Sequence, residues 1–106
     1  MKLITEEFIA TMKPYPLYSQ EHEKDPLVSA KFFNPCGGQT WFVAEYDPES
    51  QLAFCYVEGM DVDELGLTSL AEMESLKLPF GLTIERDLHF KPQRLSECSS
   101  FKPDED

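Results

Sequence analysis

Hydrophobic and polar positions alternate in three consecutive runs in the middle of the chain. The runs cover Leu27–Asn34, Thr40–Asp47 and Leu52–Glu58 and are rich in Phe, Trp, Tyr and Val, the residues that favour β-strands. The segments between them, Asn34–Gln39 and Asp47–Gln51, contain the Pro, Gly, Asn and Ser residues typical of turns. The pattern therefore predicts an antiparallel β-meander.

Both faces of each predicted strand carry apolar side chains. In the run Thr40–Asp47, strict alternation places Trp41, Val43 and Glu45 on one face and Phe42, Ala44 and Tyr46 on the other. A strand with one side in water shows a cleaner division between polar and apolar residues. We therefore expect a sheet that helices, loops or a second chain cover, at least in part, on both sides.

The first predicted helix runs from Thr5 to Lys13. Thr5 can cap the helix, the acids Glu6 and Glu7 follow in the first turn, where the helix dipole favours them, and Pro14 ends the helix. The expected inner face consists of Phe8, Ile9 and Met12.

A second helix is predicted for Leu70–Lys77. Ser69 and Glu72 have the spacing of a capping box, in which each side chain accepts a hydrogen bond from the other residue's backbone. The expected inner stripe consists of Leu70, Met73 and either Leu76 or Lys77.

The remaining elements are predicted to be short. We expect a strand at Glu64–Thr68, a final strand at Leu82–Lys91 and one helical turn within Arg94–Ser99. The final strand would point Ile84, Leu88 and Phe90 inward. The predicted fold class is α+β, an antiparallel meander of about four to five strands with two short helices.

Length and composition are those of one folded domain. The chain has 106 residues, of which 42% are hydrophobic and 12% aromatic, too apolar a composition for a disordered acidic chain. We predict a single domain at residues 1–99 and an acidic frayed tail at residues 100–106. The absence of a signal-like apolar run and the three widely spaced cysteines predict a cytoplasmic protein that does not enter a membrane.

The net charge of −11 is concentrated in the middle of the sequence, since no Lys or Arg occurs between Lys31 and Lys77. Such acidity argues against direct binding to nucleic acid, which requires a basic face, and favours a partner protein with a basic surface. The alternative is that the charge serves solubility alone. The candidate partner-binding residues are Glu45, Asp47, Glu49, Glu58, Asp61, Asp63 and Glu64.

No motif predicts a catalytic centre, a metal site or a cofactor. Asp61–Glu72 imitates a calcium loop, but Leu65 occupies a ligand position and the preceding residues predict a strand instead of a helix. Cys36 lies on a glycine-rich turn with no base near it in sequence. We therefore expect no cofactor and leave enzyme activity open, with a non-catalytic protein favoured.

Several segments of the chain carry a resemblance to a known family. They are Lys31–Pro35, Thr40–Val43 with Glu45, Asp47–Pro48, Tyr56–Gly59, Glu64–Gly66, Ser69–Leu70 and Gly81–Pro92, of which Ile84–Leu88 is the most specific part. Together they resemble the family of small bacterial proteins known as domain of unknown function 2958, from Met1 to about Leu95. The resemblance implies a protein carried by plasmids and other mobile elements, with no established activity and no catalytic residue to transfer.

The first functional hypothesis is a non-catalytic interaction protein that presents its acidic middle to a basic partner. In its sharpest form the carboxylates imitate DNA phosphates and occupy a nucleic-acid-handling host enzyme, such as restriction or CRISPR machinery. That form requires the acidic residues to form one continuous surface.

The second hypothesis is a small enzyme or ligand-binding domain with a pocket formed by Tyr18, Trp41 and Arg86. Arg86, between Glu85 and Asp87, could bind an anionic ligand, or could instead pair with an acid on a neighbouring strand. A third hypothesis is a homodimer that docks through the sheet.

Overall fold

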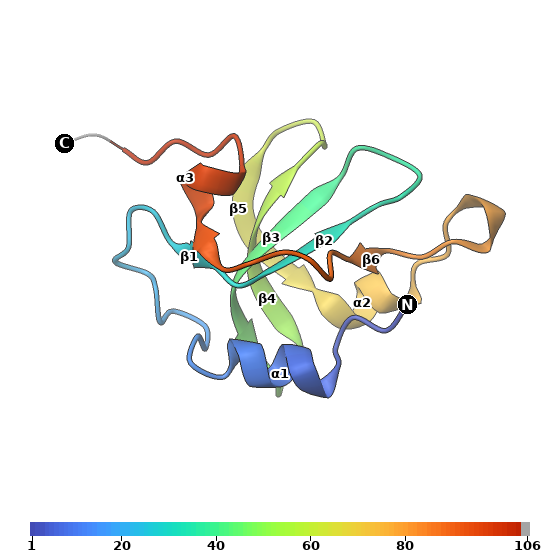
Figure 1. Ribbon diagram of the computed structural model, residues 1–106, viewed down its shortest axis with the longest axis horizontal. Helices are drawn as coiled ribbons and strands as arrows, with labels where there is room; N and C mark the ends of the chain where they lie inside the picture. The colour runs from blue at the N-terminus through green and yellow to red at the C-terminus, as the bar shows by residue number, and fades with distance from the viewer. Residues whose placement is uncertain (105–106) are drawn as a thin grey trace.

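An antiparallel five-stranded sheet with the order β5-β4-β3-β2-β6 forms the centre of the protein, shown by a computed structural model that describes residues 1–104 (Figure 1). Its strands are β2 (Ala30–Phe33), β3 (Thr40–Asp47), β4 (Leu52–Glu58), β5 (Glu64–Ser69) and β6 (Glu85–Arg86). A separate antiparallel pair joins β1 (Leu27–Val28) to β7 (Gln93–Arg94). The helices are α1 (Glu6–Met12), α2 (Leu70–Ser75) and α3 (Leu95–Cys98), with a 3-10 turn η1 at Pro79–Gly81. The predicted α+β fold class with an antiparallel meander is confirmed.

The two central strands and the two helix starts agree with the sequence patterns. Strands β3 and β4 have the predicted bounds. The Thr5 hydroxyl accepts a hydrogen bond from the Phe8 N–H at 3.0 Å and caps α1. Ser69 caps α2 in the same way, accepting from the Glu72 N–H at 3.2 Å. Local capping chemistry therefore fixes where both helices begin.

Two strand predictions are wrong. The run Leu27–Asn34 is divided at Ser29 into β1 and β2, because β1 pairs with β7 and leaves the main sheet. The predicted strand Leu82–Lys91 is reduced to β6, because the Asp87 side chain accepts a hydrogen bond from the His89 N–H at 2.9 Å and turns the chain away.

The inward-facing residues of these segments are also fewer than predicted. Ile84 is buried, and Phe90 packs against the second hydrophobic cluster, but Leu88 is exposed. Ile9 and Leu76 are exposed as well, since each short helix buries only two residues. The inner stripes of α1 and α2 are therefore narrower than the spacing of apolar residues indicated.

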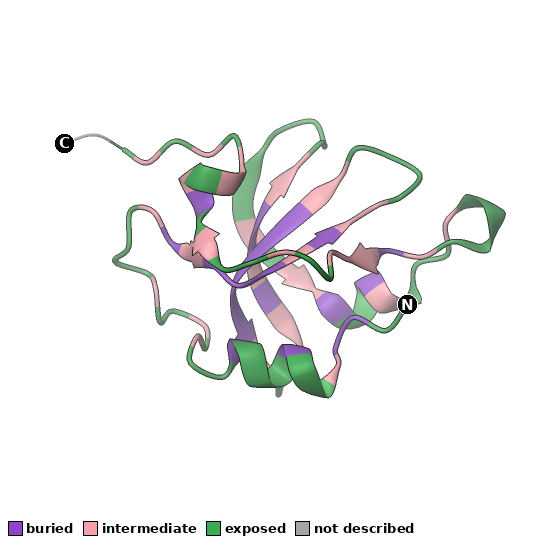
Figure 2. Cartoon of the chain, viewed as in Figure 1, coloured by how far each residue is buried: buried purple, intermediate pink, exposed green. Residues whose placement is uncertain are grey.

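Both faces of the sheet are covered by the chain itself. One face carries the larger cluster, in which Phe8 of α1 contacts Phe32 and Tyr46 with ring centroids 5.6 and 5.0 Å apart. The other face carries a smaller cluster, in which Phe42 and Tyr56 pack against Leu95 of α3. Figure 2 shows buried residues along the middle of the sheet, with exposed ones on the helices and loops. The predicted two-sided covering is confirmed.

A β-bulge in β3 corrects the predicted alternation of that strand. Val43 pairs with Cys55 and Glu45 with Phe54, so that Ala44 has no partner residue of its own on β4. The extra residue exchanges the faces of everything after it. Tyr46 therefore joins Trp41 and Val43 in the larger cluster, and Glu45 lies on the opposite face.

Glu45 fixes the segment between α1 and β1. Its two carboxylate oxygens accept hydrogen bonds from the backbone N–H groups of Tyr18 and Gln20, each at 2.8 Å. The Gln20 side chain donates to the carbonyls of Leu27 and Ala44, each at 2.9 Å. The Ala44 carbonyl in the bulge and the buried Glu45 carboxylate thus both accept hydrogen bonds from the segment between α1 and β1.

The prediction of a frayed tail at residues 100–106 is wrong for residues 100 and 101. The Ser100 hydroxyl lies 3.0 Å from the Tyr56 hydroxyl, and the Phe101 ring stacks edge-on against Tyr56 with centroids 5.4 Å apart. The chain therefore remains packed on the sheet to residue 101. The last two residues of the predicted tail, 105–106, lie outside the described residues.

Replacement of Glu45 by Gln should destabilise the protein. One of the two oxygens becomes an NH2 group that faces a backbone N–H donor, which leaves a buried group without a partner at a cost of about 2 kcal/mol. The free energy of unfolding, measured by urea denaturation, should fall by about this amount. Glu49→Gln, in the exposed turn after β3, is the control and should leave it unchanged. Equal effects of the two substitutions would contradict this role of Glu45.

Gly59 should be irreplaceable in the loop that follows β4. Its φ is +88°, and a Cβ atom would come within 2.1 Å of the Gly38 carbonyl oxygen, a contact that only backbone movement can relieve. We expect Gly59→Ala to lower the free energy of unfolding by at least about 2 kcal/mol. Gly66→Ala is the matched control, since a Cβ there has no neighbour within 4 Å. A neutral Gly59→Ala would show that the loop conformation is not required.

Candidate functional site: a groove with an acidic rim beside β5

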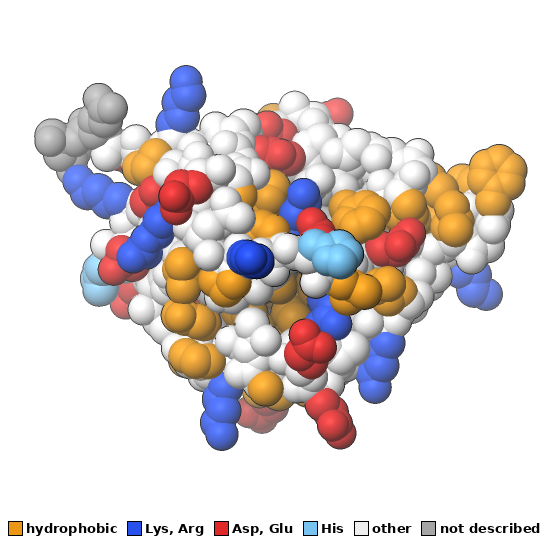
Figure 3. Space-filling model, viewed as in Figure 1, with side chains coloured by type: hydrophobic (Ala, Val, Ile, Leu, Met, Phe, Trp, Pro, Cys, Tyr) orange, Lys and Arg blue, Asp and Glu red, His pale blue; other side chains and the backbone are white. Residues whose placement is uncertain are grey.

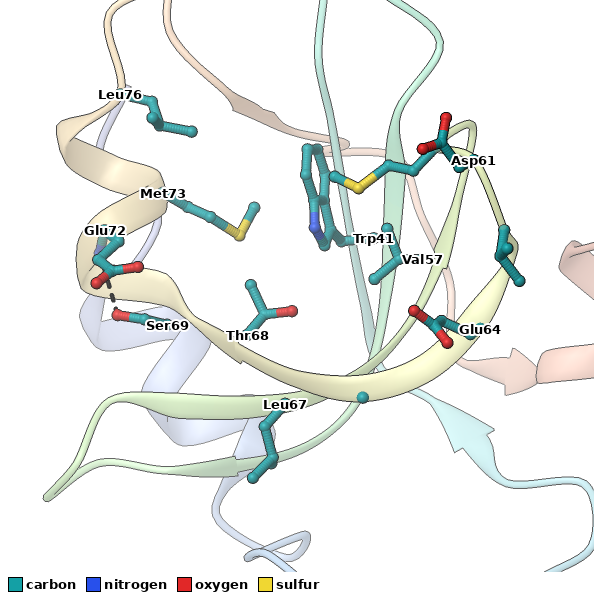
Figure 4. Close-up of a pocket in the computed structure, with 13 residues that line it drawn as sticks. Trp41, Val57, Asp61, Glu64, Leu67, Thr68, Ser69, Glu72, Met73 and Leu76 are labelled. Atoms are coloured by element: carbon teal, nitrogen blue, oxygen red, sulfur yellow. Dashed lines mark hydrogen bonds between the residues drawn. The ribbon is translucent and has the colours of Figure 1, made fainter.

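A hollow of about 640 Å³ lies between β5, α2 and the loop that follows β4. Strand β5 curves around it, and Trp41, Val57 and Met73 point into it from β3, β4 and α2 (Figure 4). We call this hollow the groove. Its residues come from β3, β4, the loop after β4, β5 and α2, which explains why no single motif predicted it.

The pairing of the strands and the residue at which α2 begins determine which side chains form the apolar floor of the groove. Trp41 pairs with Val57, and Val57 pairs with Glu64, so the three side chains lie in one row on one face of the sheet. The Ser69 cap starts α2 beside this row and places Met73 opposite Trp41. Trp41 and Met73 are almost fully buried, so they give the floor shape but little exposed area.

The rim of the groove combines apolar and acidic side chains. Met60, Val62 and Leu76 are large hydrophobic residues that remain about half exposed. The exposed carboxylates of the rim are Asp61, Glu64 and Glu72. Among the described residues, no Lys, Arg or His lines the groove. The negative potential of the rim is therefore not neutralised locally and favours a cationic ligand.

The structure separates the other predicted acidic residues from this rim. Glu45 is 4% exposed and bound to backbone N–H groups, so the prediction that it contacts a partner is wrong. Glu58 and Asp63 hold the C-terminal segment instead, accepting hydrogen bonds from the Ser100 N–H at 2.5 Å and the Ser100 hydroxyl at 3.1 Å. Glu45, Glu58 and Asp63 therefore stabilise the folded structure through these hydrogen bonds.

Asp47 and Glu49 lie at the other end of the sheet. Asp47 accepts hydrogen bonds from the hydroxyl and the N–H of Ser50, at 2.6 and 3.1 Å, which lower its pKa. Asp47 pairs with Leu52 at one end of β4, and Thr40 pairs with Glu58 at the other, a separation of roughly 20 Å along the strand. The acidic residues therefore do not form one continuous surface.

One face of the molecule agrees with this separation. On the face shown in Figure 3, acidic and basic side chains alternate, and no extended acidic area is present. The nucleic-acid-mimic form of the first hypothesis therefore lacks the arrangement that it requires.

The three residues of the alternative pocket lie apart. Trp41 lines the groove, Tyr18 a second hollow on the other face, and Arg86 a third one. The Arg86 guanidinium donates to the Thr5 hydroxyl at 3.1 Å and lies 3.7 Å from the Glu7 carboxylate. Arg86 thus ties β6 to the start of α1, where the sequence had suggested a partner on a neighbouring strand.

The thiols and acids of the described residues show no assembled catalytic or metal site. The exposed Cys36 has its backbone N–H bonded to Asn34 and its thiol 3.7 Å from the Pro79 carbonyl oxygen. Complete burial raises the pKa of the Cys55 thiol to about 12. Within residues 1–104, no group of three His, Cys, Asp or Glu side chains is placed to hold a metal ion. None of the helices there is long and apolar enough to cross a membrane.

Sequence reasoning identified part of the groove and missed the rest. It named Asp61 and Glu64 for the acidic surface and Trp41 for the alternative pocket, and the structure brings these three together. It did not single out Val57, Met60 or Val62. The available signal was the pair Met60 and Val62, two large apolar residues within a loop of acids.

The comparisons with known proteins give one match. A family model described as "Protein of unknown function (DUF2958)" matches residues 3–101. No curated protein and no solved structure matches the chain. The family match covers nearly the whole chain and includes every segment that forms the groove, and the chain therefore belongs to the DUF2958 family of proteins of unknown function.

Proposed function

We propose that this protein is a non-catalytic interaction module whose groove binds a segment of a partner protein that is both apolar and basic. The observation that carries the proposal is the composition of the groove. An apolar floor of Trp41, Val57 and Met73 lies under a rim with three carboxylates, and no Lys, Arg or His of the described residues lines the groove. Apolar burial supplies affinity in such a site, and charge complementarity supplies orientation and selectivity.

The placement of the acids favours a short segment over an imitation of nucleic acid. A phosphate mimic requires regularly spaced charges over a long surface, whereas here the exposed carboxylates of the groove gather around one hollow. A basic segment on the surface of a nucleic-acid-handling host enzyme has the required chemistry. Direct binding of nucleic acid is disfavoured by the net charge of −11.

The proposed function is that of a cytoplasmic protein, and the state of the cysteines is consistent with this location. Cys36, Cys55 and Cys98 are all free, which is typical of proteins in a reducing compartment.

A peptide selection tests the proposed function. Peptides of about ten residues, displayed on phage and selected on the wild-type protein, should combine Lys or Arg with Leu, Ile, Val or Phe. The variant Asp61→Asn, Glu64→Gln, Glu72→Gln should bind the selected peptides on the order of tenfold more weakly, because each exposed charge pair contributes about 0.5 kcal/mol. Isothermal titration calorimetry at low salt measures the difference, and added salt should reduce it.

A matched variant controls for net charge. Glu6→Gln, Glu49→Gln, Asp104→Asn removes the same number of carboxylates at exposed positions that do not line the groove and should leave peptide affinity unchanged. Equal losses in the two variants would show that only overall charge matters. Selected peptides without basic residues, or no selected peptides at all, would contradict the proposed function.

A further inference from the structure

Strand β5 is the open edge of the central sheet. Within residues 1–104 it pairs with β4 on one side and with no strand on the other. The Leu70 N–H donates to the Gln51 carbonyl at 3.0 Å, in register with the pairs of β4 and β5. Hydrogen-bonded pairs alternate along an antiparallel ladder, so Glu64, Gly66 and Thr68 direct their backbone groups to β4. The backbone groups of Leu65, Leu67 and Ser69 point outward.

Apart from the acidic side chains beside it, this edge lacks the features that usually protect a strand from pairing. It contains no Pro and no Lys, and its register with β4 runs without a bulge from Glu64 to Ser69. Leu65 and Leu67 are 37% and 53% exposed. Regular, apolar edges of this kind are templates for another strand.

A hollow borders the edge on each face of the sheet. The groove lies on the face of Glu64 and Thr68, and a hollow of about 280 Å³ lies on the opposite face, lined by Leu17, Phe54 and Leu67. Gly66 borders both hollows, and a Cβ there would meet no atom within 4 Å. Figure 4 shows Leu67 on the side of β5 away from the groove residues.

These observations match the geometry of strand addition. Successive side chains of a strand point to opposite faces, so a strand beside β5 would place alternate side chains in the two hollows. Glycine in an edge strand allows a neighbouring chain to approach closely. The carboxylates of Asp61, Glu64 and Glu72 on the groove face would lie beside the added strand. On the opposite face, acids and bases are mixed around Leu65, where Glu21 and Glu23 lie with His22, Lys24 and Lys102.

We propose that the partner segment binds as an additional β-strand along β5, with its backbone bonded to Leu65 and Leu67 and its alternate side chains in the two hollows. This inference rests on the proposed function and specifies its binding mode. The occupant is an extended segment in which apolar residues alternate or mix with Lys and Arg. A second copy of the chain is a poor occupant, because each copy carries a net charge of −11 and the two edges would bring the same acids together.

Amide hydrogen exchange measured by NMR tests the binding mode. The probe is the tightest-binding peptide from the selection described above, added to the full-length protein. The amide hydrogens of Leu65 and Leu67 should exchange rapidly in the free protein and at least about tenfold more slowly in the complex. Those of Gly66 and Thr68, already bonded to β4, should be slow in both states and serve as the internal control.

A steric variant and a modified peptide complete the test. Gly66→Val should keep the fold, because the site is open and valine suits a strand, yet it should weaken peptide binding at least about tenfold, because the valine side chain would occupy the groove beside β5. Peptides N-methylated at alternate backbone positions should fall into two classes, since only one set of N–H groups faces β5.

The outcomes separate the two proposals. Peptide binding with no protection of Leu65 and Leu67, or with equal tolerance of N-methylation at every backbone position, would overturn strand addition and leave the groove proposal standing. Peptide binding that Gly66→Val does not change would overturn both, because Gly66 lines the groove. The absence of any basic peptide ligand would overturn both. Protection of Leu65 and Leu67 in the free protein, accompanied by a dimer in sedimentation, would show that a second copy occupies the edge and would also overturn the inference.

Discussion

The positions of α1 and of the segment that joins it to the sheet depend on a single extra residue in β3, the bulge at Ala44. Because Ala44 is bulged out of register, Tyr46 turns into the core beside Phe8, and the Glu45 carboxylate turns to the other face. There it binds the N–H groups of the segment that joins α1 to the sheet, while Gln20 bonds the bulge carbonyl. A buried carboxylate is stable only when its hydrogen bonds are satisfied. The bulge and this segment therefore require each other, and the position of α1 over the sheet depends on both.

Several carboxylates that count toward the charge of the sequence are not available on the surface, and the bulge accounts for one of them, Glu45. Glu45 and Glu74 are used to hold backbone, the latter through the N–H groups of Leu3 and Ile4 at 2.7 and 2.6 Å. Glu58 and Asp63 bind the segment at Ser100. The acids that are left at the groove are few and close together. Only part of the net charge of −11 therefore lies around the groove, which is why we propose a local binding site and not a long charged surface.

Much of the fold could be predicted from the sequence because it depends on local signals. Turn residues fix the ends of β3 and β4, and Thr5 and Ser69 fix the starts of α1 and α2. The bulge could not be predicted, since nothing in Val43-Ala44-Glu45 distinguishes it from regular alternation. The shortness of β6 depends on the Asp87 turn and on pairing with β2. The groove could be predicted only in part, because Asp61 and Glu64 are marked by their charge, whereas the meeting of Trp41 with Met73 is a result of tertiary packing.

The two edges of the sheet differ in how much backbone they offer to another strand, and the net charge of the protein bears on which strand the open edge could accept. The β6 edge is two residues long, and Arg86 ties it to α1, so it offers little backbone for pairing. The β5 edge is long, regular and apolar, and such an edge normally exposes a protein to association with its own copies. Here the surrounding carboxylates oppose that association, because every copy carries the same charge. The same carboxylates would attract a basic strand. In the proposed binding mode, acidity around the open edge would therefore disfavour pairing with a second copy of the chain and favour a partner of opposite charge.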